Sequence, residues 1–178
     1  ATEYIDGVFT GKYAYKYDSS GNEIEKVSYN YDNVLSSTVV NNYDSNGNKI
    51  ESMWRKSDGT IYKKEVCEYD SDGNMIEEAQ YNSDGSLSNK TTYAYDSNGN
   101  KTEYCYYRED GSLSSKTTYA YDSNGNMIEQ TKYNSDGSLF SKRTYAYDSS
   151  GNWIEITRYE GDALTPTEQI VREIVYRK

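Results

Sequence analysis

Strand-forming segments alternate with turn-forming clusters along almost the whole chain. Segments rich in Thr, Tyr, Ile and Val, which favour β-strands, are separated by short clusters of Asp, Asn, Ser and Gly. Asp-Gly and Asn-Gly are typical of hairpins, because Gly adopts the positive φ that these turns require. No segment has the 3.6-residue periodicity of an amphipathic helix. The pattern predicts an all-β protein, a long antiparallel meander of about 13 strands.

The two kinds of turn recur with a fixed period. The sequence Tyr-Asp-Ser-x-Gly-Asn begins every 26 residues, at Tyr17, Tyr43, Tyr69, Tyr95, Tyr121 and Tyr147. A second turn lies between these motifs, at Asp58-Gly59, Asp84-Gly85, Asp110-Gly111 and Asp136-Gly137. Each repeat is therefore expected to be one β-hairpin. The predicted organisation is a single repeat domain (1–178): an N-terminal half repeat (1–16), repeats that start at residues 17, 43, 69, 95 and 121, and a degenerate C-terminal capping repeat (147–178).

The turns also predict which side chains share a face of the sheet. With three-residue loops and Gly in the left-handed conformation, Asn134 pairs with Ser138, Tyr133 lies opposite Leu139, and Tyr121 lies opposite Met127. Strict alternation then gives one tyrosine-rich face. Three columns are expected on it: the motif tyrosines, the column Tyr29/Tyr81/Tyr107/Tyr133/Tyr159, and the column Tyr15/Tyr93/Tyr119/Tyr145. We expect the sheet to twist and curl with this face concave.

Composition and charge narrow the function. Only 34% of the residues are hydrophobic and 22 are Tyr, so cross-strand aromatic pairs must replace much of an aliphatic core. A net charge of −10 argues against nucleic acid and anionic membrane surfaces as partners. No apolar run is long enough to predict a transmembrane segment. Cys67 and Cys105 fall three strands apart in the predicted register, too far for a disulfide, and are expected to be free thiols.

A glutamate follows each motif Tyr by eight residues. The set is Glu25, Glu51, Glu77, Glu103, Glu129 and Glu155. Such a row could bind sugar hydroxyls or cations, or it could be structural and accept hydrogen bonds from neighbouring strands. The structural interpretation is favoured, because a repeated residue in a repeated fold needs no ligand. Strict alternation predicts the neighbours of three of them: Cys67 and Thr91 for Glu77, Tyr93 and Thr117 for Glu103, Tyr119 and Arg143 for Glu129.

Four aromatic residues are candidates for stacking on a ligand, with an ordinary hydrophobic patch as the alternative. Trp54, Tyr104 and Tyr106 fall on the more polar face where other repeats have Glu, Gln or Lys, and Trp153 falls on the tyrosine-rich face. The loop from Asp70 to Asn74 has ligands that suit calcium, but its Gly comes too early for an EF-hand. No metal or cofactor is expected.

Catalysis has little support in the sequence. The chain contains no His, so neither a Ser-His-Asp triad nor an imidazole-activated thiol is available. Glycosidases need two carboxyl groups made unlike by their environments, whereas the glutamates here recur in equivalent positions. We expect no catalytic residues and no enzymatic activity.

The motif resembles that of a known class. Tyr95-Asp96-Ser97-Asn98-Gly99-Asn100 and its equivalents are similar to the YD repeats of Rhs-type bacterial proteins, over nearly the whole chain. The segment from Gly151 to Tyr176 is similar to the ends of small exported or lipoprotein-type YD-repeat proteins. The resemblance implies a β-repeat fold and an extracytoplasmic location (periplasm, cell surface or secreted), with a lipid anchor possible in the precursor. The large members of the class enclose a toxic C-terminal domain in a β shell.

These observations together predict a non-enzymatic extracytoplasmic scaffold or binding module, with carbohydrate or a cell-surface protein as its partner. The alternatives are an orphan fragment of an Rhs-like toxin-delivery shell and, from a different class, a glycan-processing enzyme.

Overall fold

The computed structural model describes residues 2–5, 8–161 and 165–175. Fourteen strands follow one another in sequence order as an antiparallel meander, and the described residues include no helix. The predicted fold class is therefore confirmed, with one strand more than expected. The strands are β1 (Thr2–Ile5), β2 (Val8–Tyr17), β3 (Glu23–Tyr29), β4 (Leu35–Tyr43), β5 (Lys49–Lys56), β6 (Ile61–Tyr69), β7 (Met75–Asn82), β8 (Leu87–Tyr95), β9 (Lys101–Tyr107), β10 (Leu113–Tyr121), β11 (Met127–Asn134), β12 (Leu139–Tyr147), β13 (Trp153–Glu160) and β14 (Glu168–Val171).

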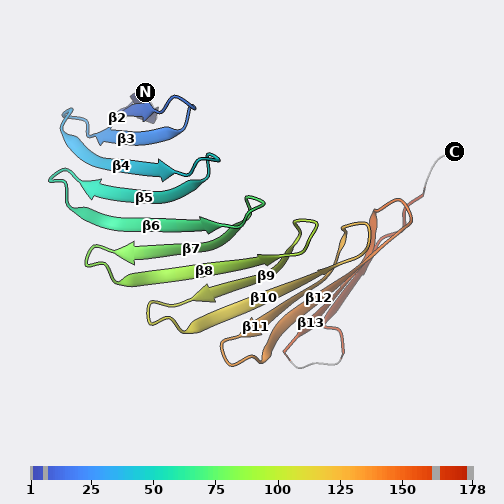
Figure 1. Cartoon of the computed structure of the whole chain (residues 1–178). Helices are drawn as coiled ribbons and strands as arrows, with labels where there is room; N and C mark the ends of the chain where they lie inside the picture. Colours follow the sequence, from blue (N-terminus) through green and yellow to red (C-terminus); the bar gives the residue numbers. More distant parts are fainter. Residues whose placement is uncertain (1, 6–7, 162–164, 176–178) are drawn as a thin grey trace. The chain divides into compact units, whose positions relative to one another are not determined.

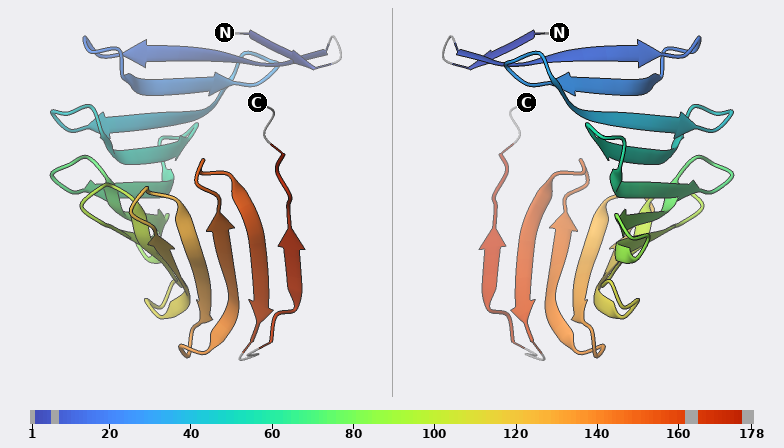
Figure 2. Two further views of the ribbon diagram at one scale, coloured as in Figure 1. Left: turned by 90° about the vertical axis from the view of Figure 1, so that its right-hand side faces the viewer. Right: turned by 90° about the vertical axis from the view of Figure 1, so that its left-hand side faces the viewer.

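The chain divides into two compact units, Ala1–Lys90 and Thr91–Lys178. Within each unit, the described strands contact only the strands that precede and follow them (Figures 1 and 2). Each unit is therefore a single layer of sheet, without a second layer on either face. The expectations of one domain and of a curled sheet stay predictions.

Burial in a single layer comes from side chains of neighbouring strands. The buried residues are accordingly small: Cys67, Ala79 and Cys105 among the hydrophobic ones, and Asn41, Ser52, Thr91, Thr117, Thr131 and Thr157 among the polar ones. A short side chain in mid-strand is covered by the longer Tyr, Lys and Glu side chains that flank it. The two cysteines are free thiols, as expected.

The hairpin loops have the predicted geometry. The Asn134 N–H donates to the Ser138 carbonyl at 2.9 Å, and the Gly137 N–H donates to the Asn134 carbonyl at 3.1 Å. All six motif glycines have a positive φ, from +79° to +88°. At the second turn of the first full repeat, Asn33 takes this place with φ of 59°, which Asn tolerates better than most residues do.

A β-bulge follows the loop of each hairpin from β2 to β7 and from β9 to β13, and it changes the facing of the side chains. Tyr133 lies opposite Leu139 as predicted, but Lys132 lies opposite Ser141, which leaves Phe140 as an extra residue. Across the other turn, Ile128 is the extra residue, between the partners of Tyr121 and Ala120. One inserted residue moves every later side chain of the strand to the other face.

The prediction of one tyrosine-rich face is therefore wrong. The column Tyr29/Tyr81/Tyr107/Tyr133/Tyr159 lies on the same face as the glutamates, but Tyr15, Tyr93, Tyr119 and Tyr145 lie on the opposite face. We call the first the glutamate face; its other members include Glu51, Met53, Lys64, Val66, Glu77 and Ala79 in the first unit, and Glu103, Cys105, Lys116, Thr118, Glu129, Thr131, Lys142, Thr144 and Thr157 in the second. The bulges bring lysines onto this face, where strict alternation had excluded them.

The loop glycines provide a direct test of the hairpin geometry. A Cβ added at Gly125, where φ is +82°, would meet no atom within 4 Å, so Gly125→Ala should be destabilising through backbone conformation alone. We expect a loss of about 1 kcal/mol in the free energy of unfolding, measured by urea denaturation. Asn124→Ala in the same loop is the control and should have almost no effect. Equal stability of Gly125→Ala and the wild type would contradict the loop assignment.

Candidate functional site

The six glutamates form ion pairs or hydrogen bonds on the glutamate face. Glu103 pairs with Lys116 at 2.5 Å, Glu129 with Lys142 at 2.7 Å, Glu51 with Lys64 at 2.5 Å, and Glu77 with Lys90 at 3.2 Å. At the ends of the series, Glu25 lies 4.0 Å from Lys16, and Glu155 accepts hydrogen bonds from Gln169 and Thr157. A lysine amine therefore lies within 4.0 Å of five of the six glutamates, whereas an amide and a hydroxyl hold Glu155.

The register explains why the lysines reach the glutamates. Glu103 lies directly opposite Thr118, and Lys116 is two residues earlier on the same strand and the same face. Such diagonal neighbours are within reach of long side chains. The hydrogen bond from Lys116 lowers the pKa of Glu103, and Lys142 lowers that of Glu129 in the same way. Both carboxylates are about one-third exposed, so each pair contributes little to stability.

The neighbours predicted for the central glutamates are wrong because of the bulges. Besides Lys116, Glu103 accepts a hydrogen bond from the Cys105 thiol at 3.3 Å, and neither Tyr93 nor Thr117 shares its face. The register places Ala120 and Thr144 opposite Glu129, and Glu68 opposite Glu77, instead of the residues expected. The structural role of the glutamates stays a prediction, but these contacts support it.

The motif Asp and Asn close their turn through side-chain hydrogen bonds. One carboxylate oxygen of Asp122 accepts the Asn124 and Asn126 N–H groups, both at 2.9 Å, and the other accepts the Asn126 amide at 3.0 Å. These bonds lower the pKa of Asp122. The turns at Asp18, Asp44, Asp70 and Asp96 repeat the arrangement. In the loop that resembles a calcium site, Asp70 thus bonds to the N–H groups of its own turn.

The motif Tyr ties neighbouring strands together at the same edge. The Tyr121 hydroxyl donates to the Lys101 carbonyl at 2.8 Å, joining the end of β10 to the start of β9. Tyr43, Tyr69 and Tyr147 donate in the same way to the carbonyls of Glu23, Lys49 and Met127. Burial raises the pKa of these four hydroxyls. Sequence analysis did not predict this hydrogen bond, because the motif Tyr suggested only aromatic packing.

Three of the four candidate aromatic residues already have an intramolecular neighbour at the ring. Trp54 has the Lys63 amine 4.6 Å from its ring centroid, and Trp153 has the Arg172 guanidinium at 4.1 Å. Tyr104 packs edge-on against Tyr93 with centroids 5.7 Å apart. Tyr106 is half-buried on β9. A ligand role for these residues stays a prediction.

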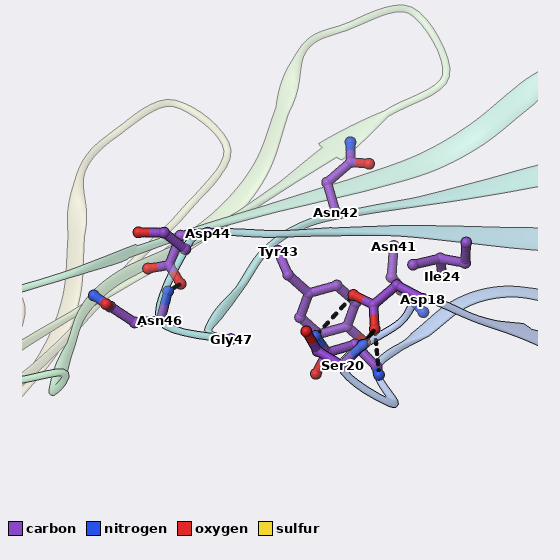
Figure 3. Close-up of a pocket in the computed structure, with 11 residues that line it drawn as sticks. Asp18, Ser20, Ile24, Asn41, Asn42, Tyr43, Asp44, Asn46 and Gly47 are labelled. Carbon is purple, nitrogen blue, oxygen red and sulfur yellow. Dashed lines mark hydrogen bonds between the residues drawn. The ribbon is translucent and has the colours of Figure 1, made fainter.

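An open hollow of about 560 Å³ lies beside the first two motif turns of the first unit (Figure 3). Its lining is mostly polar and comes from the turn after β2, the start of β3, and the end of β4 with the turn that follows: Asp18, Ser20, Asn22, Ile24, Asn41, Asn42, Tyr43, Asp44, Ser45, Asn46 and Gly47. The sequence contained one signal for it. Asn41 occupies the column in which Tyr15, Tyr93, Tyr119 and Tyr145 stand, so a large side chain is replaced by a small one.

Comparison with known proteins gives no family for the chain. No family model matches, and no curated protein matches either. Among solved structures, TcdB2-TccC3-Cdc42 and the Photorhabdus luminescens Tc holotoxin pore are each 15% identical, with TM-scores of 0.32 and 0.33. Each match covers 90% of this chain and 12% of the other. A porin-like protein from Bacteroides uniformis is 11% identical with a TM-score of 0.33, over 83% of this chain and 81% of that one. Likeness at this level carries no argument about function.

The sequence predicts no transmembrane segment, and the structure can be compared with this prediction. The described part of the chain contains no helix long and apolar enough to cross a bilayer.

The tyrosine hydrogen bond can be tested by removing one oxygen atom. Tyr121→Phe leaves the ring in place but deprives the Lys101 carbonyl of its donor, and we expect a loss of about 1 kcal/mol in the free energy of unfolding. Tyr17→Phe is the matched control, since Tyr17 is 56% exposed and makes no such hydrogen bond to a described residue. An equal effect of the two variants in urea denaturation would show that the hydroxyl of Tyr121 contributes nothing specific.

The motif carboxylates predict a dependence of stability on pH. The folded pKa of Asp122 is depressed, so its contribution is fully present above the unfolded pKa of about 4 and is lost as the pH falls through the folded pKa. Asp122→Asn should therefore melt at a lower temperature than the wild type at pH 7, and the gap should narrow at pH 2. Thermal melts followed by circular dichroism at both pH values test this. If the difference in melting temperature is the same at both pH values, the effect of Asp122→Asn comes from the shape of the side chain and not from its charge.

Proposed function

We propose that this chain is a non-enzymatic, extracytoplasmic β-repeat scaffold that acts as a binding module, with carbohydrate or a protein partner as its ligand. The observation that carries the proposal is the use of the recurrent polar groups. The motif Asp closes its own turn, the motif Tyr joins adjacent strands, and the glutamates pair with lysines or amides. The repeated residues build the sheet, and the residues that differ between repeats are free to recognise a ligand.

The environment of the carboxylates supports a role without catalysis. A glycosidase needs one carboxyl group with a raised pKa as acid and a second, ionised one as base or nucleophile. The pKa values of Glu51, Glu103 and Glu129 are instead all lowered, each chiefly by a hydrogen bond from lysine. Three equivalent, ionised groups provide no proton donor near neutral pH.

The proposed location rests on the resemblance of the repeated motif to exported YD-repeat proteins. A surface of ionised turns and a net charge of −10 suits a protein that must stay soluble while it presents an extended sheet. The same charge disfavours polyanionic partners.

A turnover assay tests the scaffold proposal. The purified protein, incubated with a panel of oligosaccharides and polysaccharides, should release no new reducing ends or unsaturated products above a buffer control. Glu103→Gln should lower the free energy of unfolding by only about 0.5 kcal/mol, because the ion pair is partly exposed. The same variant should retain all ligand binding of the wild type. Turnover that disappears in Glu103→Gln would overturn the proposal in favour of a glycan-processing enzyme.

A further inference from the structure

We propose that the hollow beside the first two motif turns, together with a row of tyrosines on β2, is a binding site for a neutral oligosaccharide. The inference rests on the proposed role as a binding module and assigns that role a site. It depends on three features of the first unit: a replaced tyrosine, a lining of amides and hydroxyls, and exposed aromatic rings next to it.

A small residue of the tyrosine column lines the hollow. Cys67 also replaces Tyr in this column, but it lies outside the hollow. Asn41 is only 8% exposed and is held on both sides: its amide donates to the Glu23 carbonyl at 2.8 Å, and its carbonyl oxygen accepts from the Ser52 hydroxyl at 2.8 Å. The two hydrogen bonds therefore hold the Asn41 side chain in one position at the bottom of the recess. In the second unit, Tyr93 fills the equivalent position and packs on Tyr104. A preformed, rigid recess lowers the entropic cost of binding.

The lining suits vicinal hydroxyl groups. Ser20, Asn22, Ser45 and Asn46 contribute short polar side chains around the recess, and Figure 3 shows Tyr43 extending from β4 toward the turn that carries Ser20. Amide and hydroxyl groups both donate and accept, as sugar hydroxyls do.

The charge of the recess excludes anionic sugars. Asp18 and Asp44 border it, and hydrogen bonds within their turns lower the pKa of both carboxylates, so they stay ionised. Each can still accept a hydrogen bond from a sugar hydroxyl through an unused lone pair. Two negative charges favour a neutral ligand over uronic or sulfated sugars, and they disfavour phosphate for the same reason.

Exposed aromatic rings continue the site along β2. The ring centroids of Tyr13 and Tyr15 are 6.5 Å apart, and those of Tyr15 and Tyr17 are 6.4 Å apart with nearly parallel planes. The Lys26 amine lies over the Tyr13 and Tyr15 rings, 4.7 Å and 5.7 Å from their centroids. Tyr15 is 38% exposed and Tyr17 is 56% exposed, so Tyr17 has the most accessible ring of the row. Rings with an apolar face and a hydroxyl tip can pack on the C–H face of a sugar while hydrogen-bonding its rim.

The register connects the row to the hollow. Tyr17 lies opposite Glu23, and the Glu23 carbonyl accepts the hydrogen bonds of Asn41 and Tyr43. One strand thus separates the row from the recess, a span of about 10 Å from β2 to β4. A ligand that uses both must be longer than one sugar ring, so the site is expected to prefer oligosaccharides.

The experiment compares binding by variants that fill or strip the site. The intact protein is screened on an array of neutral and anionic glycans, and the strongest ligand is titrated by calorimetry. Asn41→Tyr introduces the residue that stands at the equivalent positions 15, 93, 119 and 145, and it fills the recess. We expect its affinity to fall about tenfold or more. Cys67→Tyr introduces the same residue one repeat further on, outside the recess, and is expected to bind like the wild type. Tyr17→Ala and Asn46→Ala alter exposed positions at the site and keep the test available if Asn41→Tyr does not fold.

Each outcome decides between specific alternatives. Binding of a neutral glycan that Asn41→Tyr and Tyr17→Ala both weaken supports the site. Binding that these variants leave unchanged overturns the site but leaves the binding module intact, and so does a preference for anionic glycans. If no glycan binds at all, the inference fails, whereas the scaffold proposal still depends on the turnover assay. Binding that disappears on addition of a calcium chelator would assign recognition to a bound cation and would overturn direct recognition by the amide and hydroxyl lining.

Discussion

A single layer of sheet has no interior, and this constraint governs the structure of both units. In a sandwich or a barrel, side chains from a second layer cover each strand. Here the described strands of each unit contact only the preceding and following strands. Every buried group must therefore be covered by a lateral neighbour, and every polar group must find a partner in the same sheet. Small residues such as Thr131 and Cys105 become the most buried ones, while long side chains lie across them.

The 26-residue motif supplies these lateral contacts in a few residues. Gly allows the loop to turn, Asp accepts hydrogen bonds from the loop N–H groups and from the Asn amide, and Tyr donates to a carbonyl of the preceding strand. A bulge at the start of β10 then turns this strand so that Lys116 meets Glu103 on one face. Each of these contacts is weak, but many of them together stabilise the sheet in place of a buried hydrophobic core.

The use of repeated residues for contacts within the sheet separates structural from functional positions. A residue that recurs in each repeat and bonds within the sheet needs no ligand to explain it, whereas a departure from the repeat does need an explanation. Asn41 is such a departure, because it lines a recess and belongs to a column in which four repeats have Tyr (Tyr15, Tyr93, Tyr119 and Tyr145). Tyr17 keeps the motif residue but departs in its exposure, because its ring is exposed while the later motif tyrosines are half-buried. Both departures lie in the first unit, which is why recognition is assigned there and not to the repeated glutamates.

The sequence by itself determined the strands, the order of the hairpins and the geometry of their loops. These depend on interactions within about five residues, such as the positive φ of Gly125 and the hydrogen bonds of Asp122 to its own turn. Only the tertiary structure decided the faces. Phe140 and Ile128 are bulged by the pairing of two strands, and neither hydrophobic period nor turn chemistry marks a bulge. Because one extra residue inverts the alternation, Tyr119 was expected beside Glu129 but lies on the other face, and Lys142 takes its place. The hollow also depends on strand pairing. The sequence shows Asn41 in a column of tyrosines, but the turns that border the recess come together only once the strands are paired.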